Sequence, residues 1–310
     1  MTDLGKIFAV LVVFLFMGSA KAGETATPIA SGPLDKSLKA DDKKKLERDP
    51  LAKGIQDNSF LIEEAYNQEA GVVQHIFTAR RSIDRKSGVD DKAWDLSFTQ
   101  EWPVISQDHQ LSYTVPYSLL DESGRSSKGV GDVALNYRWQ ALYESEDRPA
   151  FAPRFSFLLP TGDESAGFGS GKLGYQLNLP VSKVIGDRWT FHFNAGTTIL
   201  PRQRVRLDDD TPSPKRTLYN FNLGLSSIYA VSKNFNLMLE YAGTDDHQFN
   251  ERGATTRTYT SVLSPGVRFA FSIPAANDAQ LVLGFAAPIG LNRKAPDVGA
   301  FMYLSFEHSF

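Results

Sequence analysis

Apolar and polar side chains alternate along most of the chain, from about residue 71 to the C-terminus. In residues 111–119 the apolar Leu, Tyr and Val positions alternate with Ser and Thr. In residues 302–310 Met, Leu and Phe alternate with Tyr, Ser and Glu. A period of two is the side-chain period of a β-strand, so each segment predicts a strand with one apolar face. About twelve such segments follow one another, most of about 10–14 residues, which is long for soluble sheets but suits tilted membrane strands.

The connections between these segments alternate between long and short. Residues 83–92, 120–130 and 201–215 form long connections, whereas residues 105–108 and 185–187 form short ones. Bacterial outer-membrane barrels combine short periplasmic turns with longer external loops. We therefore expect residues 71–310 to form an all-β, transmembrane, antiparallel up-and-down barrel of about 12 strands in the outer membrane of a Gram-negative bacterium. An even strand number places both chain ends on the periplasmic side.

Two observations leave alternatives to this fold. A soluble β-sandwich or propeller also alternates, although its polar face is richer in Lys and Glu than the Ser-, Thr-, Asn- and Gln-rich face found here. In addition, Pro116, Pro153, Pro180, Pro265 and Pro288 fall inside the expected strands. Each proline removes a hydrogen-bond donor, and a closed barrel has no free edge at which that loss is harmless. Bulges or shifted boundaries would accommodate them, which leaves a strand count of about ten to fourteen.

The composition excludes several classes of function. The 310 residues contain no cysteine, which excludes disulfides, thiolate metal sites and cysteine nucleophiles. The formal net charge of −3 argues against nucleic-acid binding, because such domains usually carry a strong basic excess. The mean hydropathy of −0.27 excludes a helical membrane bundle. It is compatible with a membrane barrel, since half of every barrel strand faces a polar lumen.

The N-terminal part of the chain has the features of a secretory signal. A charged start precedes the apolar run Ile7–Met17, and an Ala-x-Ala sequence ends at Ala22. We therefore expect residues 1–22 to be a signal peptide. Residues 23–70 are predicted to form a polar arm in the periplasm and the segment that leads into the barrel. Residues Gly23–Ser59 are interpreted as a solvated, largely disordered arm; the alternative is a plug in the lumen or a segment that docks a partner.

Two short motifs flank long connections of the expected barrel. Gly129-Val130-Gly131-Asp132 opens a strand, and Leu159-Pro160-Thr161-Gly162-Asp163 closes one. With the segment Phe60–Glu69, these motifs resemble the outer-membrane family associated with the phenol meta-cleavage degradation pathway. The resemblance covers roughly residues 59–310. It implies an outer-membrane barrel that passes small hydrophobic or aromatic solutes. The motif positions are Gly129, Gly131, Asp132, Pro160, Thr161, Gly162 and Asp163.

The C-terminal residues are similar to the last-strand signal of outer-membrane proteins. Met302, Leu304 and Phe306 precede the terminal aromatic Phe310 in steps of the strand period, with His308 as a departure from the usual aromatic or aliphatic residue. A last strand with an open edge can pair with a strand of the barrel-assembly machinery before the barrel closes. We therefore expect outer-membrane lipid and this machinery as partners; the oligomeric state stays open.

Charged and polar residues on the inner faces are the candidate functional residues. Charges inside a membrane protein tend to pair with one another or to line a water-filled path. Two interpretations follow: salt bridges that fill and stiffen a narrow barrel, or a lining that sets selectivity. The candidates are Asp95, Glu101, Asp132, Arg138, Arg154, His192, Glu240, Arg268 and Glu307.

The sequence offers no catalytic, cofactor or metal motif, so we expect a channel rather than an enzyme. An esterase needs a serine, a histidine and an orienting polar group within reach of one another, and no Gly-x-Ser-x-Gly motif is present. His75 and His308 are expected side by side on the lipid face of the first and last strands, most simply as residues of the membrane interface. Two alternatives stay open: an outer-membrane lipid hydrolase, and a structural protein that tethers the envelope through residues Ala40–Lys53.

Overall fold

The computed structural model describes residues 50–55, 57–85, 90–122, 124–204, 215–249, 254–273 and 279–309. The expected signal peptide, nearly all of the tethering segment and Phe310 lie outside these residues. A 3-10 turn, η1 (Leu51–Lys53), precedes the strands. The part of the chain that the structure describes contains no helix long and apolar enough to cross a membrane.

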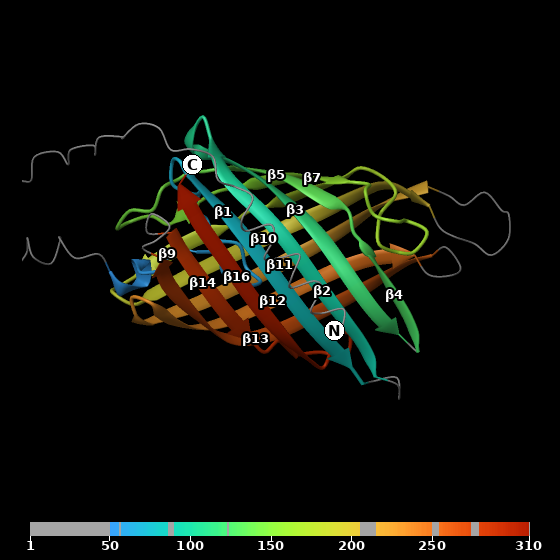
Figure 1. Cartoon of the computed structure of the whole chain (residues 1–310). Helices are drawn as coiled ribbons and strands as arrows, with labels where there is room; N and C mark the ends of the chain where they lie inside the picture. Colours follow the sequence, from blue (N-terminus) through green and yellow to red (C-terminus); the bar gives the residue numbers. More distant parts are fainter. Residues whose placement is uncertain are drawn as a thin grey trace, which may run out of the picture. The chain divides into compact units, whose positions relative to one another are not determined.

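The strands pair antiparallel with their neighbours around a closed barrel (Figure 1). Closure comes from two pairings, since β1 pairs with β16 and β10 pairs with β11. The strands are β1 (Val72–Asp84), β2 (Asp91–Val104), β3 (Ser106–Glu122), β4 (Arg125–Val130), β5 (Val133–Trp139), β6 (Ala150–Phe151), β7 (Arg154–Leu159), β8 (Gly174–Asn178), β9 (Val181–Ile185), β10 (Trp189–Arg204), β11 (Lys215–Ser232), β12 (Phe235–Phe249), β13 (Thr255–Ile273), β14 (Ala279–Ala286), β15 (Ile289–Gly290) and β16 (Val298–Ser309).

We call one complete crossing of the barrel wall a stave. Four of the staves consist of two consecutive short strands each. β4 and β5 both pair with β3, and β8 and β9 both pair with β10. Likewise β6 and β7 lie along β9 and β8, while β14 and β15 lie between β13 and β16. Counting each interrupted stave once gives twelve, so the prediction of a twelve-stranded antiparallel barrel is confirmed.

The prolines lie at these interruptions. Pro153, Pro180 and Pro288 fall between the two short strands of their staves. Pro116 and Pro265 lie within long strands, opposite an interruption: Gly131 N donates to the Pro116 carbonyl at 3.0 Å, and Ala287 N to the Pro265 carbonyl at 2.9 Å. The barrel therefore tolerates each missing donor by breaking the ladder of the same or the neighbouring stave.

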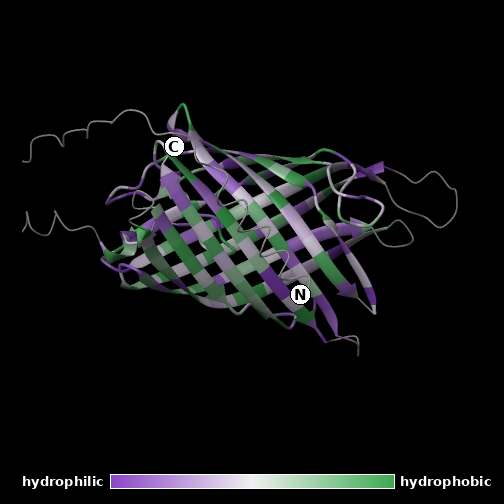
Figure 2. Ribbon diagram, in the orientation of Figure 1, coloured by the Kyte–Doolittle hydropathy of each residue, from purple (hydrophilic) through white to green (hydrophobic). Residues whose placement is uncertain are grey.

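Apolar side chains point outward and polar side chains inward, the reverse of a soluble protein. Tyr137 and Phe157 are exposed, whereas Asn136, Arg138 and Ser156 on the same strands are buried. Figure 2 shows this alternation of hydrophobic and hydrophilic residues along the strands. A soluble sandwich would bury the apolar face, so the arrangement fits a barrel surrounded by lipid.

The two family motifs contact each other at the break between β4 and β5. Asp132 accepts hydrogen bonds from Gly162 N at 3.0 Å and from Ser170 N at 2.8 Å. Thr161 Oγ1 donates to the Gly131 carbonyl at 3.1 Å. Gly129 lies against the ring of Phe168, because a Cβ added there would come within 2.6 Å of that ring. The motif thus holds the loop between β7 and β8 against the end of β5.

Asp132 was predicted to line the lumen on a strand, and the structure gives it a different place. It lies between β4 and β5 and bonds to the loop. The period of two breaks at Gly131-Asp132, so the register extrapolated from the strand on either side fails there.

Replacing Asp132 with alanine should loosen this loop. Hydrogen bonds to a carboxylate contribute about 1.5–3 kcal/mol each when buried and less when partly exposed, as here. We expect hydrogen exchange at Gly162 N and Ser170 N, measured by mass spectrometry, to speed up by about tenfold or more in Asp132→Ala. Lys128→Ala, an exposed change on β4, is the control. Equal exchange rates in both variants would contradict the role assigned to Asp132.

Candidate functional site

The residues before β1 run through the inside of the barrel rather than away from it. We call residues 57–71 the lumenal segment. Its Ala65 and Ile62 are almost fully buried, at 0% and 3% exposure. The segment contacts inward-facing side chains of staves all around the barrel. Residues 57–59 belong to the stretch predicted to be a solvated arm, but Asp57 and Ser59 are buried in the lumen, as the plug alternative has it. Residues 60–70, predicted to lead into the barrel, continue along the same path.

The lumenal segment has no regular secondary structure, so its backbone groups need other partners. Lumen side chains supply them at every second residue. Leu61 N donates to Glu240 Oε1 at 3.2 Å, and Glu63 N donates to Asn194 Oδ1 at 2.7 Å. Further along, Ala65 N donates to Ser182 Oγ at 2.7 Å, and Asn67 N donates to Gln140 Oε1 at 3.0 Å. The inner wall thus replaces a neighbouring strand for an extended peptide.

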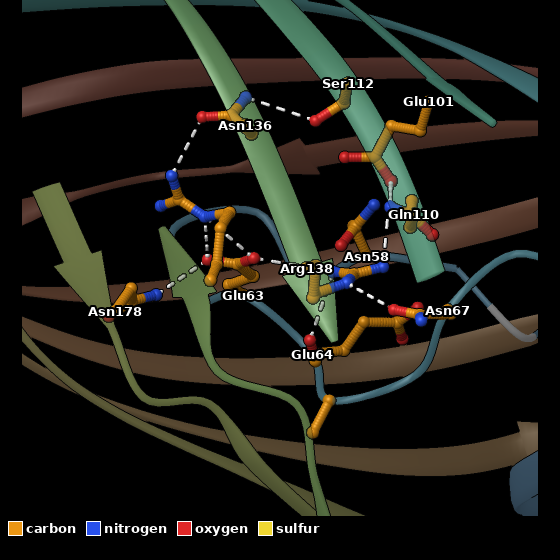
Figure 3. A network of polar contacts seen from close by, with 12 residues as sticks. Asn58, Glu63, Glu64, Asn67, Glu101, Gln110, Ser112, Asn136, Arg138 and Asn178 are labelled. Atoms are coloured by element: carbon orange, nitrogen blue, oxygen red, sulfur yellow. Dashed lines mark hydrogen bonds and ion pairs between the residues drawn. The ribbon is translucent and has the colours of Figure 1, made fainter. Parts of the chain in front are cut away.

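Two arginines bind the carbonyl groups of the same peptide. Arg268 donates to the carbonyls of Asp57 at 2.7 Å, Asn58 at 3.1 Å and Ile55 at 3.1 Å. Arg138 donates to the carbonyls of Tyr66 at 2.6 Å and Glu64 at 3.3 Å (Figure 3). Both guanidinium groups are 2% exposed, and their planar forks match several acceptors at once.

Glu63 is the centre of the charged network in Figure 3. Its carboxylate accepts from Arg154 Nε at 2.8 Å, Arg138 Nη1 at 3.4 Å and Asn178 Nδ2 at 2.6 Å. Burial alone would raise the pKa of Glu63, but the attraction of Arg154 and Arg138 outweighs it and lowers the pKa below its usual value. Glu63 is therefore ionised at neutral pH, and its ion pairs with Arg138 and Arg154 fix the segment to β5 and β7.

Glu64 and Asp57 are buried carboxyl groups of the segment whose pKa values are raised, in contrast to that of Glu63. Burial raises the pKa of Glu64 to about 8, and the nearby Arg138 offsets only part of this. Burial also raises the pKa of Asp57, with Arg268 offsetting part of it. Asp57 accepts from Tyr303 OH and Gln74 Nε2, both at 2.6 Å. The docked segment therefore favours the protonated form of both groups.

Apolar side chains of the segment fit a patch of the lumen wall built around glycines. The Phe60 ring lies 5.5 Å from the rings of both Phe301 and Tyr303. A Cβ added at Gly284 would overlap the Phe60 ring, and one added at Gly266 would come within 2.9 Å of it. We call this position the Phe60 socket. Its apolar neighbours in the same cluster are Ile76, Ile228, Met238, Ala270 and Val282.

Six of the predicted inward residues gather around the lumenal segment. Arg138, Arg154, Glu240 and Arg268 contact it directly, while Glu101 accepts from Gln110 Nε2 at 2.8 Å beside Arg138. His192 Nδ1 lies 2.7 Å from Ser182 Oγ, the acceptor of the Ala65 N–H. Their role in selectivity stays a prediction.

Of the two remaining predicted strand residues, Asp95 lies apart from this network, whereas Glu307 lies beside Gln68 of the lumenal segment. Asp95 pairs with Arg80 at 2.8 Å in a partly exposed ion pair. Glu307 lies on β16 beside Gln74 of β1 and Gln280 of β14. Five neutral partners of the segment were not predicted from the sequence: Gln110, Gln140, Asn178, Ser182 and Asn194. Only their inward positions in the period-two pattern indicated that they face the lumen.

A hydrolase would require a free nucleophile beside a histidine, and two histidine contacts can be compared with this requirement. His75 Nε2 lies 3.2 Å from His308 Nε2, and the His75 ring stacks with Phe98 and Phe306. Both imidazoles contact each other and aromatic rings rather than a nucleophile. Ser182 and His192 are within hydrogen-bond reach, but the serine oxygen is bonded to the segment. Within the described ranges no three His, Asp or Glu side chains gather to hold a metal ion.

Sequence comparison identifies the family. The profile of the family described as "Putative MetA-pathway of phenol degradation" matches residues 64–298. The chain belongs to this family. The resemblance noted from the two motifs is thereby confirmed, and the match includes both of them as well as most of the barrel. No curated protein sequence matches the chain.

Solved structures with similar folds are outer-membrane barrels. An outer-membrane channel from Pseudomonas putida F1 is 14% identical, with a TM-score of 0.58, over 79% of this chain and 98% of that one. The translocator domain of the autotransporter NalP from Neisseria meningitidis is 12% identical, with a TM-score of 0.49, over 78% and 90%. The first of these shows that the fold is that of an outer-membrane barrel.

Enlarging a glycine of the Phe60 socket should displace the segment. In Gly284→Val the new side chain would occupy the space of the Phe60 ring. We expect the ionic conductance of the protein in planar lipid bilayers to rise severalfold, because the segment no longer fills the lumen.

The matched control for this change is Gly243→Ala. The nearest atoms to a Cβ at this position on β12 would be the hydroxyl oxygens of Tyr259 and Tyr241, at 3.1 and 3.2 Å, and a ring carbon of Tyr259 at 3.6 Å, all outside the Phe60 socket. Conductance of the control should equal that of the unmodified protein. A Gly284→Val protein that folds, by circular dichroism, and conducts no better than this control would show that Phe60 does not hold the segment in place.

The raised pKa of Glu64 predicts that docking of the segment weakens as pH rises. Below pH 4.5 the carboxyl is protonated whether docked or free, so there is no effect. Between pH 4.5 and about 8 the free segment loses this proton while the docked one retains it, which favours release progressively. Asp57 acts in the same direction. The lowered pKa of Glu63 acts only below the usual range and leaves this window unaffected.

Conductance in planar bilayers should therefore increase between pH 5 and pH 8, and Glu64→Gln should flatten this increase. The amide keeps the shape of the side chain and carries no charge at any pH. A variant whose conductance follows pH as steeply as that of the unmodified protein would exclude Glu64 as the titrating group.

Proposed function

We propose that the protein is a passive outer-membrane channel for small hydrophobic or aromatic solutes, closed by its own lumenal segment. The family description and the barrel fold support a channel. The segment occupies the lumen through contacts with side chains rather than through strand pairing, so it can leave without breaking the barrel wall. On this proposal the segment is the gate.

The observation that carries the choice of solute is the Phe60 socket. Barrel lumens are ordinarily polar, yet here an aromatic ring is buried inside against Phe301, Tyr303 and the two glycines Gly266 and Gly284. Once the segment leaves, the same surface offers a flat apolar site of the size of a phenyl ring. A small aromatic solute can occupy it and bury apolar area that contributes about 25 cal/mol per Å².

The orientation and assembly of the protein are part of the same proposal. Twelve staves place the start of β1 and the end of β16 at the same end, which we assign to the periplasm. The lumenal segment then enters from that side, after a signal peptide at residues 1–22 is removed. Met302, Leu304 and Phe306 lie on the outward face of β16, where the barrel-assembly machinery can contact them.

Solute uptake by liposomes tests the channel. We expect protein-containing liposomes to take up phenol and toluene faster than protein-free liposomes. Phe60→Ala should increase the rate further, because the site becomes vacant and the segment loses an anchor. Leu223→Ala, an outward-facing change on β11, serves as the control. Equal uptake by liposomes with and without protein, for both solutes, would refute a channel for aromatic compounds.

A further inference from the structure

A second space in the lumen has a different chemistry from the Phe60 socket. It is a cavity of about 330 Å³ whose floor is formed by Leu61 and Glu63 of the lumenal segment. We call it the amide chamber. Its walls come from β7, β8, β10, β11 and β12. The lining side chains are mostly amides and hydroxyls, among them Gln176, Asn178, Asn194, Thr198, Asn220 and Asn222. Its size is within the range of small-molecule sites.

Several of these amides have hydrogen-bonding capacity left over. Gln176 uses its Nε2 to donate to Thr198 Oγ1 at 3.0 Å, and Asn222 uses its Nδ2 to donate to Asn178 Oδ1 at 3.4 Å. Asn220 uses its Oδ1 to accept from His247 N at 2.8 Å. Within the described part of the chain, this leaves Gln176 Oε1 and Asn222 Oδ1 as acceptors and Asn220 Nδ2 as a donor, all on walls of one cavity.

An ion pair and a separate carboxylate are the charged groups of the chamber. Glu63 is neutralised by Arg154 at 2.8 Å. Asp246 accepts from Thr244 Oγ1 at 2.9 Å, and its negative charge disfavours an anionic occupant. Away from Asp246, the remaining donor and acceptor groups lie side by side on uncharged side chains. A hydroxyl group of a ligand can both donate and accept a hydrogen bond. It can therefore bond to the free acceptors and to the free donor of the chamber wall.

We propose that the amide chamber binds small neutral molecules that carry two or more hydroxyl groups. The inference rests on the channel proposal only in placing the chamber on the route of a solute. An apolar molecule of equal size would leave the free amide groups without water and without partners, at a cost of about 1–3 kcal/mol for each. Such a molecule is accepted by the Phe60 socket but rejected here.

Equilibrium binding to the purified protein in detergent tests this site independently of transport. The probes are catechol and glucose, which share adjacent hydroxyl groups, and toluene, which has none. Isothermal titration calorimetry should show binding of catechol or glucose and no binding of toluene at this site. Binding of catechol alone assigns the chamber to hydroxylated aromatic compounds, and binding of glucose assigns it to sugars.

Two chamber variants and one control locate the binding. Asn222→Leu and Gln176→Leu each remove a free acceptor, and each should weaken binding about tenfold, the effect of one such hydrogen bond. Asn222→Ser is a smaller change that keeps a hydroxyl and should weaken binding less. Leu223→Ala, the outward neighbour of Asn222, should leave binding unchanged.

The proposal is overturned if toluene competes with catechol or glucose, if neither hydroxylated probe binds, or if the folded chamber variants bind as well as the control. These outcomes are separate from failure of the channel. A protein that binds catechol through Asn222 but passes no solute into liposomes would refute the channel and leave the chamber in place.

Discussion

The backbone of the lumenal segment must find hydrogen-bond partners inside a closed barrel, and this requirement organises the interior. Apart from the short β4 and β6, every barrel strand pairs with a neighbour on both sides, and the inserted peptide pairs with no edge of the described strands. The inner wall solves the problem with side chains. Carboxylate, amide and hydroxyl oxygens take the N–H groups of alternate residues, and Arg138 and Arg268 take the carbonyls. Because these contacts recognise the backbone, the segment is held along its length without becoming part of the wall.

The backbone groups of the barrel wall also need hydrogen-bond partners, and the prolines show how the strands meet this need. A proline within a closed ladder leaves a carbonyl on the neighbouring strand without its usual donor. A stave is interrupted at or opposite Pro116, Pro153, Pro180, Pro265 and Pro288, and the strand register shifts at Pro103 and Pro201. At one of these breaks the freed backbone is bonded by Thr161 and Asp132 of the two family motifs. The motif residues are thus explained by loop geometry. Nothing in their contacts requires a solute.

The fold could be predicted from the sequence because alternation and loop length are local signals that each strand repeats. Even the nearness of His75 and His308 followed from closing the first strand on the last. The path of the lumenal segment could not be predicted. Its polar composition suits water and a polar lumen equally well, and only the partners across the barrel decide between them. The neutral amides were missed for a related reason: an isolated Asn or Gln carries no charge pattern, and its importance appears only when Asn194 and Gln140 meet the peptide.

The extended lumenal segment lies between an apolar site, the Phe60 socket, and a polar site, the amide chamber. Successive side chains of an extended peptide point to opposite sides. Phe60 faces the apolar wall and Glu63 faces the amide chamber, while Leu61 borders both. The two sites are therefore linked through one element. On the proposal that the segment gates a channel, a molecule that binds the chamber against Leu61 and Glu63 requires the docked segment and by mass action stabilises the closed state. On the same proposal, a molecule that binds the Phe60 socket requires the segment to leave and stabilises the open state. We then expect a solute with both hydroxyl and aromatic groups to bind in either state and to move from the chamber to the socket as the segment leaves.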